Sequence, residues 1–299
     1  MMSIPFDRPG SGSYAPAVTV PSIVELIRTG TLDAELAAQL WLLIEARVPL
    51  IVAAEVPETG STTVLAALLD FLPAGVQVVK LGGVDEDFAW LPQATELGWP
   101  GVDRPVEGNA PIRSDTTVLS VNEFSDRLPE HTWGAAAMVA VRAASIGYGL
   151  TATIQGDSLD DVFEMLRQPP VRLTDDELSH LGVALVLRAV EGGRRRVVAA
   201  HYIRPVARDT HGHIQRLGPA VLATWDPMTD TFEHFGWGVT PELAMRVGRH
   251  AGDFEIEVDR RRDVLADLAA GDEMEPEAAL SAIRGYRPAP VVDAPEADT

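Results

Sequence analysis

One segment near residue 50 restricts the possible folds more than any other part of the chain. The apolar run LIVAA at 50–54 is followed directly by a loop containing Pro57 and Gly60, and then by TTVLAALLDF at 62–71, with apolar residues at helical spacing. Five consecutive apolar residues are typical of a strand buried on both faces of a parallel sheet. Strand, loop and helix in this order predict the start of a βαβ unit, and therefore an α/β fold.

The loop after this strand partly matches the phosphate-binding pattern Gly-x-x-x-x-Gly-Lys-Ser/Thr. In this frame Glu55 replaces the first glycine, Gly60 is the second, Ser61 replaces the lysine, and Thr62 is the hydroxyl residue. In a working loop, backbone N–H groups hold the phosphates and the lysine neutralises their charge. Because serine carries no charge, the sequence predicts the shape of a phosphate-binding loop without its main cation.

Two carboxylates in the same loop, Glu55 and Glu58, act in the same direction. A carboxylate a few ångströms from a phosphate costs about 1–4 kcal/mol at effective dielectric constants of about 80 to 20. Lys80, the only lysine of the chain, ends the next predicted strand and could reach the same crevice, although a surface lysine is the simpler interpretation. We therefore expect weak nucleotide binding and no hydrolysis.

The composition is that of an acidic globular protein. Hydrophobic residues make up 46% of the 299 residues, and the formal net charge is −20. Such a charge repels nucleic acid, so no nucleic-acid partner is expected. The absence of cysteine excludes disulfides and thiolate metal sites, and together with the lack of a secretory signal or a long apolar run it predicts a cytoplasmic protein.

Further strands and helices alternate along the chain, which favours a doubly wound α/β core with added β-hairpins and C-terminal helices. The patterns predict strands at 76–81, 116–124 and 150–156, helices at 133–147 and 158–168, hairpins at 182–206 and 220–235, and two helices within 255–286. We divide the chain into a flexible arm at 1–20, a core at 21–250, a helical segment at 251–287 and a disordered tail at 288–299.

Four segments, in this order, resemble the hexameric ATPases of type II and type IV secretion systems, above all the branch that assembles archaeal pili and archaella. The segments are TLDAELAAQLWLLIEARVPLIVAAEVPETGSTTVLAALLDFLPAGVQVV, GYGLTATIQGDSLDDVFEML, RRRVVAAHYI and RRRDVLADLAAGDEMEPEAALSAIRGY. The first resembles the segment leading through the family's P-loop, the second its histidine box, the third its Arg-Arg-Val-Val strand, and the fourth its C-terminal helices. The resemblance implies a P-loop NTPase (RecA-like) core.

The positions that carry the family's chemistry differ here. Besides the loss of the P-loop lysine at Ser61, the acidic Ile-Glu-Asp box reads KLGG at 80–83, and the histidine of the histidine box is Gln155. In the Walker B segment Gly134 matches the last glycine, but Trp133 replaces the arginine. What matches is the scaffold rather than the active site.

The catalytic carboxylate of that Walker B segment has two candidates. Glu123 is the equivalent if the strand VLSVNEF is the guide, and Glu130 if the spacing to Gly134 is. A glutamate at a strand end is just as often structural. By the resemblance, Gly60, Ser61, Thr62 and Thr63 would form a degenerate nucleotide-binding loop, with ATP and Mg²⁺ as cofactors if binding is retained.

Other charged clusters are weaker candidates. His211 and His213 lack a third ligand, so no metal site is expected. The arginine triplets 194–196 and 260–262 could bind acidic groups, but exposed faces with Arg–carboxylate pairs are the simpler interpretation.

The leading functional hypothesis is a degenerate member of the secretion ATPase family without hydrolysis. It would be a structural or regulatory partner of a pilus or secretion motor, in an oligomer with itself or with an active paralogue. The resemblance also implies contact with a membrane platform protein at the inner face of the cell membrane. The alternatives are an unorthodox active ATPase, with Glu123 as catalytic carboxylate and Thr62 as the Mg²⁺ hydroxyl, and a free-standing regulatory protein.

Overall fold

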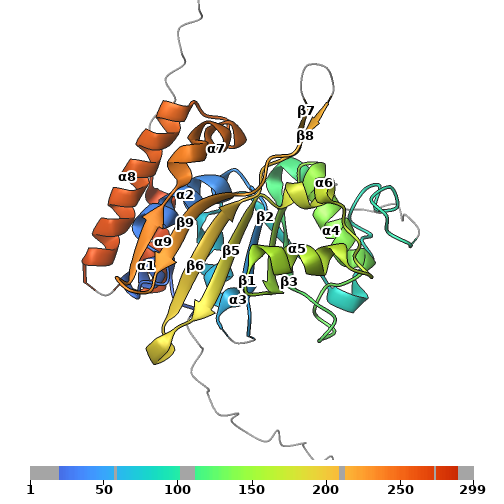
Figure 1. Ribbon diagram of the computed structural model, residues 1–299, viewed down its shortest axis with the longest axis horizontal. Coiled ribbons are helices and arrows are strands. Elements are labelled where there is room, and N and C mark those ends of the chain that lie inside the picture. The colour runs from blue at the N-terminus through green and yellow to red at the C-terminus, as the bar shows by residue number, and fades with distance from the viewer. Residues whose placement is uncertain (1–19, 57–58, 102–111, 209–212, 273, 289–299) are drawn as a thin grey trace, which may run out of the picture.

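The apolar run 50–54 forms strand β1 (Leu50–Ala54), whose five residues are all buried inside an eight-stranded sheet. The structure is a computed structural model that describes residues 20–56, 59–101, 112–208, 213–272 and 274–288. Most of the predicted arm at 1–20 and of the tail at 288–299 therefore lies outside the described residues. Figure 1 shows the sheet with helices on its two faces.

The strand order of the sheet is β10-β9-β6-β5-β1-β4-β3-β2. Its strands besides β1 are β2 (Gln77–Lys80), β3 (Thr117–Phe124), β4 (Gly149–Gln155), β5 (Val183–Ala189), β6 (Arg195–Tyr202), β9 (Ala220–Asp226) and β10 (Thr231–His234). β5, β1, β4, β3 and β2 run parallel, whereas β6, β9 and β10 are antiparallel. The predicted α/β core with two added hairpins is confirmed. A separate two-stranded ribbon joins β7 (Ala207–Arg208) to β8 (Ile214–Gln215).

One prediction about strand pairing is wrong. The sequence places β1 and β2 in one βαβ unit as neighbours, but β1 pairs with β4 on one side and β5 on the other. β2 forms the far edge of the sheet, and β4 and β3 lie between it and β1. Residues 77, 78 and 80 of β2 are exposed, as suits an edge strand, and nothing in a local apolar pattern says which strand it pairs with.

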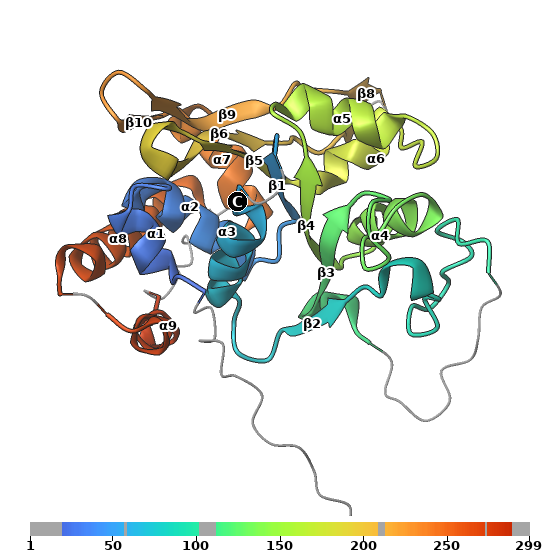
Figure 2. The same cartoon turned by 90° about the horizontal axis from the view of Figure 1, so that it is seen from below.

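Helices cover both faces of the sheet (Figure 2). One face carries α1 (Ile23–Arg28), α2 (Ala34–Glu45), α3 (Ser61–Leu68), α7 (Thr240–Arg246), α8 (Ala251–Ala270) and α9 (Pro276–Gly285). The other carries α4 (Ala135–Ser145), α5 (Leu159–Arg167) and α6 (Asp175–Leu178). Because successive strand residues point to opposite faces, Leu50 and Val52 join the first core and Ile51 joins the second.

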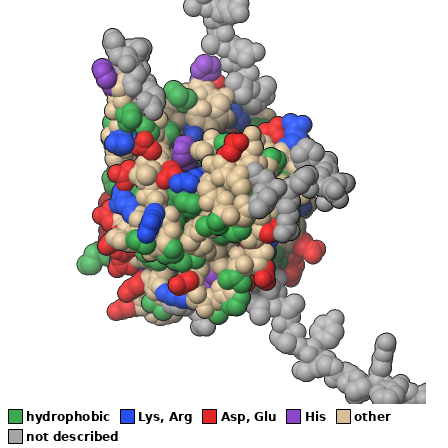
Figure 3. Space-filling model, turned by 90° about the vertical axis from the view of Figure 1, so that its right-hand side faces the viewer, with side chains coloured by type: hydrophobic (Ala, Val, Ile, Leu, Met, Phe, Trp, Pro, Cys, Tyr) green, Lys and Arg blue, Asp and Glu red, His purple; other side chains and the backbone are tan. Residues whose placement is uncertain are grey.

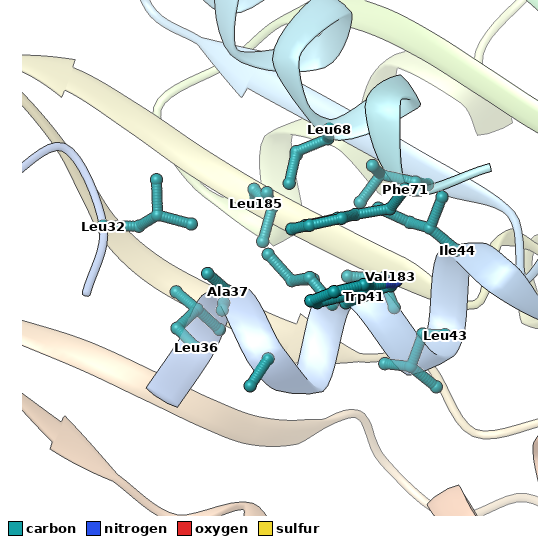
Figure 4. Close-up of a cluster of buried hydrophobic side chains, with 14 of the residues drawn as sticks. Leu32, Leu36, Ala37, Trp41, Leu43, Ile44, Leu68, Phe71, Val183 and Leu185 are labelled. Atoms are coloured by element: carbon teal, nitrogen blue, oxygen red, sulfur yellow. The ribbon is translucent and has the colours of Figure 1, made fainter. Parts of the chain in front are cut away.

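The helices predicted at 62–71, 133–147 and 158–168 are confirmed as α3, α4 and α5. Asp33 caps α2, with its Oδ1 accepting a hydrogen bond from Leu36 N at 2.9 Å, and Ser158 caps α5. The two predicted C-terminal helices are α8 and α9, whereas α7 was not predicted. α8 packs along α2, and the stacked rings of Trp41 and Phe71, with centroids 5.0 Å apart, lie in this core (Figure 4).

Candidate phosphate-binding site

The loop after β1 ends at the N-terminus of α3, at the carboxyl edge of the parallel strands. Gly60 is the N-cap residue with φ of 99°, in the left-handed region that favours glycine. It makes no side-chain capping bond, so within the described chain no side chain satisfies the N–H groups of the first turn of α3. Thr59 Oγ1 donates to the Val56 carbonyl at 2.6 Å and holds the loop in a turn. These N–H groups are the donors that an anion uses at a helix N-terminus.

One cavity of about 260 Å³ is lined by the predicted loop residues 60–63, by Glu123 and by Gln155. The lining residues are Ala54, Val56, Gly60, Ser61, Thr62, Thr63, Glu123, Arg127, Ile154, Gln155 and Arg195. β1, β3, β4, β6 and α3 thus contribute to one site. The roles of these residues in binding remain predictions.

The structure separates the two candidates for a catalytic carboxylate. Glu123 lines the cavity from β3, and its Oε1 is buried without a hydrogen-bond partner in the described part of the chain. The same oxygen lies 3.8 Å from Nδ1 of His131, and that nitrogen is 2.7 Å from Ser125 Oγ. Glu130 is exposed and is not among the lining residues. Position therefore favours Glu123.

Gln155, at the histidine-box position, connects the end of β4 to the loop after β1. Its Nε2 donates to the backbone carbonyl of Glu55 at 2.8 Å. The exposed side chain of Glu55 belongs to a neighbouring cavity of about 630 Å³, which Asp157 and Asp161 also line. A hydrogen bond between these two aspartates raises the pKa of Asp157 and lowers that of Asp161.

The expected crowding of carboxylates around the phosphates is therefore smaller than the sequence indicates. Of the two loop carboxylates, Glu55 does not line the first cavity, and Glu58 lies outside the described residues. Among the residues that do line it, Glu123 is the acidic one, against two arginines.

Arg195 and Arg127 are the lining residues that sequence reasoning missed. Arg195 begins β6, and because β6 is antiparallel to β5, its first residue pairs with Ala189 at the end of β5. The start of β6 therefore lies at the same sheet edge as the loop after β1. A Cβ atom on Gly60 would lie 2.8 Å from Arg195 Nε, so the arginine packs directly on the loop.

The interpretation of the triplet 194–196 as ion-paired is correct for two of its members. Arg194 Nη1 and Arg196 Nε bond Asp230 at 2.7 and 2.8 Å. Arg195, between them, points to the opposite side of the strand. The alternation of side chains along a predicted strand is the signal that could have distinguished it.

Lys80 does not reach the cavity in this structure. It ends β2, three strand spacings or roughly 14 Å from β1. Its side chain is exposed and is absent from the lining residues. The simpler interpretation, a surface lysine, agrees with this position.

The lining residues fit an Mg²⁺–nucleotide in part. Hydroxyls of Ser61 and Thr62 and the carboxylate of Glu123 are the hard oxygen ligands that Mg²⁺ prefers. Within the described ranges no three His, Cys, Asp or Glu residues form a metal-binding group of their own, and His211 lies outside those ranges. Any bound Mg²⁺ would thus depend on the phosphates.

Comparisons with known proteins give distant similarities. No family model matches the chain. The uncharacterized protein MJ1287 of Methanocaldococcus jannaschii is 26% identical over 250 residues, which are 78% of this chain and 85% of that protein. The uncharacterized protein MJ0900 of the same organism is 24% identical over 264 residues, and this chain spans 46% of its length.

Two solved structures are similar to parts of the chain. The VirB11 ATPase of the Brucella suis type IV secretion system, crystallised with sulphate, is 19% identical, with a TM-score of 0.34, covering 62% of this chain and 66% of that one. The ATPase DotB of Legionella pneumophila is 12% identical, with a TM-score of 0.32, covering 83% and 58%. Neither similarity is close enough to assign a function.

The class of protein follows instead from the sheet and the loop. The parallel order β5-β1-β4-β3-β2, with a strand–loop–helix at the carboxyl end of β1, defines a P-loop NTPase-like α/β core. No helix in the described part of the chain is long and apolar enough to cross a membrane.

Proposed function

We propose that this chain is a non-hydrolysing relative of the secretion and pilus-assembly ATPases that acts as a structural or regulatory partner of such a motor. The observation that carries the proposal is the contrast within one cavity. The loop, the first turn of α3 and Glu123 line one cavity, which supports an ancestral nucleotide site, while Ser61 stands where the sequence pattern has its lysine. Without that lysine the charge of the β- and γ-phosphates is not neutralised from the loop.

The resemblance of four sequence segments to that family supports the pathway. Under this proposal the chain assembles with itself or with an active ATPase paralogue in the cytoplasm, beside a membrane platform protein. The net charge of −20 is unsuited to nucleic acid, and on the face seen in Figure 3 acidic and basic side chains are interspersed.

One observation favours a second candidate, an unorthodox active ATPase. Glu123 Oε1 is buried and has no hydrogen-bond partner among the described residues, as a carboxylate that acts on a bound water would be before the ligand arrives. In this alternative Glu123 is the catalytic base and Thr62 binds Mg²⁺.

Phosphate release from ATP by the purified full chain distinguishes the two. We expect no release above the background without protein, and the same result for Glu123→Gln. Turnover that Glu123→Gln abolishes would contradict the first proposal and support the second. The Glu130→Gln variant is the matched control. Its rate of phosphate release should equal that of the parent chain, since Glu130 is exposed and outside the cavity.

Purification from the native cells tests the partner role. A tagged full-length chain is expected to bring with it an ATPase that has an intact P-loop lysine, in a stoichiometric complex. A chain that elutes as a free monomer from lysates in which that ATPase is present would contradict a partner role and favour a free-standing regulator.

A further inference from the structure

Arg195 is an exposed arginine without an anionic partner in a strongly acidic protein. Its neighbours Arg194 and Arg196 share Asp230, whereas within the described residues no carboxylate lies at ion-pair distance from Arg195. Its guanidinium packs against Gly60 at the N-terminus of α3, the positive end of the helix dipole. A cation at this position is unfavourable unless an anion joins it.

The cavity beside Arg195 is built to receive that anion. Arg127, from the segment after β3, also lines it, so two arginines from separate elements contribute to one cavity. Arg127, too, has no carboxylate partner among the described residues. Gly60 allows the close approach of Arg195, because a Cβ atom at this position would force the arginine side chain to shift.

A second cavity continues from the first on the other side of Arg195. It measures about 330 Å³, and Gly60, Thr63 and Arg195 line both cavities. Its other walls include the apolar residues Leu26 and Val64 and the polar residues Thr29 and Thr31, with Glu25 and Arg194 as charged groups. A mostly apolar pocket with a few polar groups is typical of a site for an organic ring system.

We propose that Arg195 supplies the phosphate-binding charge that the loop lacks at Ser61, and that the two cavities bind a nucleoside polyphosphate. The phosphates lie in the cavity between Arg195, Arg127 and the α3 N-terminus, and the nucleoside lies in the cavity beside Leu26. The guanidinium forms two parallel hydrogen bonds with phosphate oxygens, which a lysine at the loop position does not. The inference rests on the proposed function in one respect, that the loop is a phosphate site. It requires that the chain binds a nucleotide and does not depend on hydrolysis.

Binding of ADP and ATP to the full chain, measured by calorimetry, tests the role of Arg195. Arg195→Ala is expected to weaken binding at least tenfold, and Arg195→Lys is expected to retain an intermediate affinity. Arg188→Ala is the matched control, because it removes an exposed arginine of the neighbouring strand β5 that lines neither cavity; its affinity should stay within twofold. Equal affinities of Arg195→Ala and the parent chain, or no binding by the parent chain at millimolar nucleotide, would overturn the inference.

A second variant tests the geometry without removing the charge. Gly60→Ala places a methyl group 2.8 Å from Arg195 Nε at a backbone φ of 99°, so that the arginine side chain or the loop has to shift, and it should weaken ADP binding to a similar extent. Circular dichroism and the thermal midpoint without ligand verify that each variant is folded. A folded Gly60→Ala chain with full affinity would contradict the placement of Arg195 over the loop.

Pyrophosphate and inorganic phosphate are the probes for the second cavity. ADP is expected to bind at least tenfold more tightly than pyrophosphate, because the nucleoside occupies the second cavity and pyrophosphate leaves it empty. Equal affinities would overturn the assignment of that cavity. The failure of this inference can be distinguished from the failure of the proposed function. Absent nucleotide binding overturns the inference and leaves a non-hydrolysing partner role intact, whereas ATP turnover contradicts that role and leaves the role of Arg195 in binding intact.

Discussion

Arg261 and Arg195 belong to two regions in which the same side chain serves different purposes. Arg261 of α8 is 1% exposed, with Nε bonded to Glu257 at 2.9 Å and Nη2 placed 2.5 Å from Glu45. Its guanidinium also lies 4.7 Å from the ring centroid of Trp41. Arg195 is exposed, faces a cavity and has no carboxylate partner in the described chain.

The comparison shows that an arginine with carboxylate partners inside the protein can stabilise the packing of helices. Around Arg261, α2, α8 and α9 meet, and Tyr286 donates to Glu257 Oε1 at 3.1 Å. These contacts offset the cost of burying the charge and tie the C-terminal helices to the core. Arg195 stabilises no such contact, so its charge is available to a ligand.

Replacing Arg261 tests the structural half of the comparison and has the largest expected effect. Arg261→Met leaves Glu257, which is 2% exposed, as a buried carboxylate without its cation. We expect the free energy of unfolding to fall by about 3–5 kcal/mol, measured by urea denaturation.

The adjacent Arg262 is the matched control for this experiment. It pairs with Asp259 and Asp263 on the surface, so Arg262→Met should cost no more than about 1 kcal/mol. A loss for Arg261→Met as small as that of the control would show that the buried ion pairs are not what stabilises this region.

The predictions from local pattern succeeded where local physics decides the outcome. The run at 50–54 is buried on both faces because one core lies on each side of the sheet, and the helix predicted at 158–168 begins where Ser158 accepts a hydrogen bond from Asp161 N. The position of β2 was wrong, since an apolar pattern identifies a strand but not its neighbours in the sheet.

The sequence predicted several residues of the candidate site, but not the arginines that line it. Gly60, Glu123 and Gln155 could be placed together because the carboxyl ends of parallel strands share one edge. The two arginine triplets look alike in the sequence, and both were interpreted as exposed faces. Burial of Arg261 depends on how α8 packs on α2, and the direction of Arg195 depends on the register of β6, neither of which is a local property.

His234 provides an intermediate case, a side chain that forms ion pairs only when it is protonated. Its Nε2 lies 2.7 Å from Asp33 Oδ2, and its Nδ1 lies 3.8 Å from Glu35 Oε1. Burial lowers the pKa of His234, but the hydrogen bond to Asp33 and the nearby charges outweigh it, so that the pKa is raised. This contribution to stability is present in full below about pH 6.5 and is lost as the pH rises through the folded-state pKa.

The variant His234→Gln removes that contribution and should change the pH dependence. The difference in unfolding free energy between the parent chain and His234→Gln is expected to shrink as the pH is raised from 5.5 to about 8.5, measured by urea denaturation at fixed ionic strength. A difference that stays constant or grows with pH would contradict the raised pKa.

Arg195 should have the smallest effect on the unliganded protein. Because Arg195 bonds no carboxylate in the described part of the chain, Arg195→Ala is expected to change the unfolding free energy by less than about 0.5 kcal/mol without ligand. With ADP at about 100 times its dissociation constant, the parent chain gains about 2.7 kcal/mol, and a variant that binds tenfold more weakly gains only about 1.4 kcal/mol. Thermal midpoints with and without ADP measure both quantities. A variant that is destabilised equally with and without ADP would show that Arg195, like Arg261, has a structural role and does not bind the ligand.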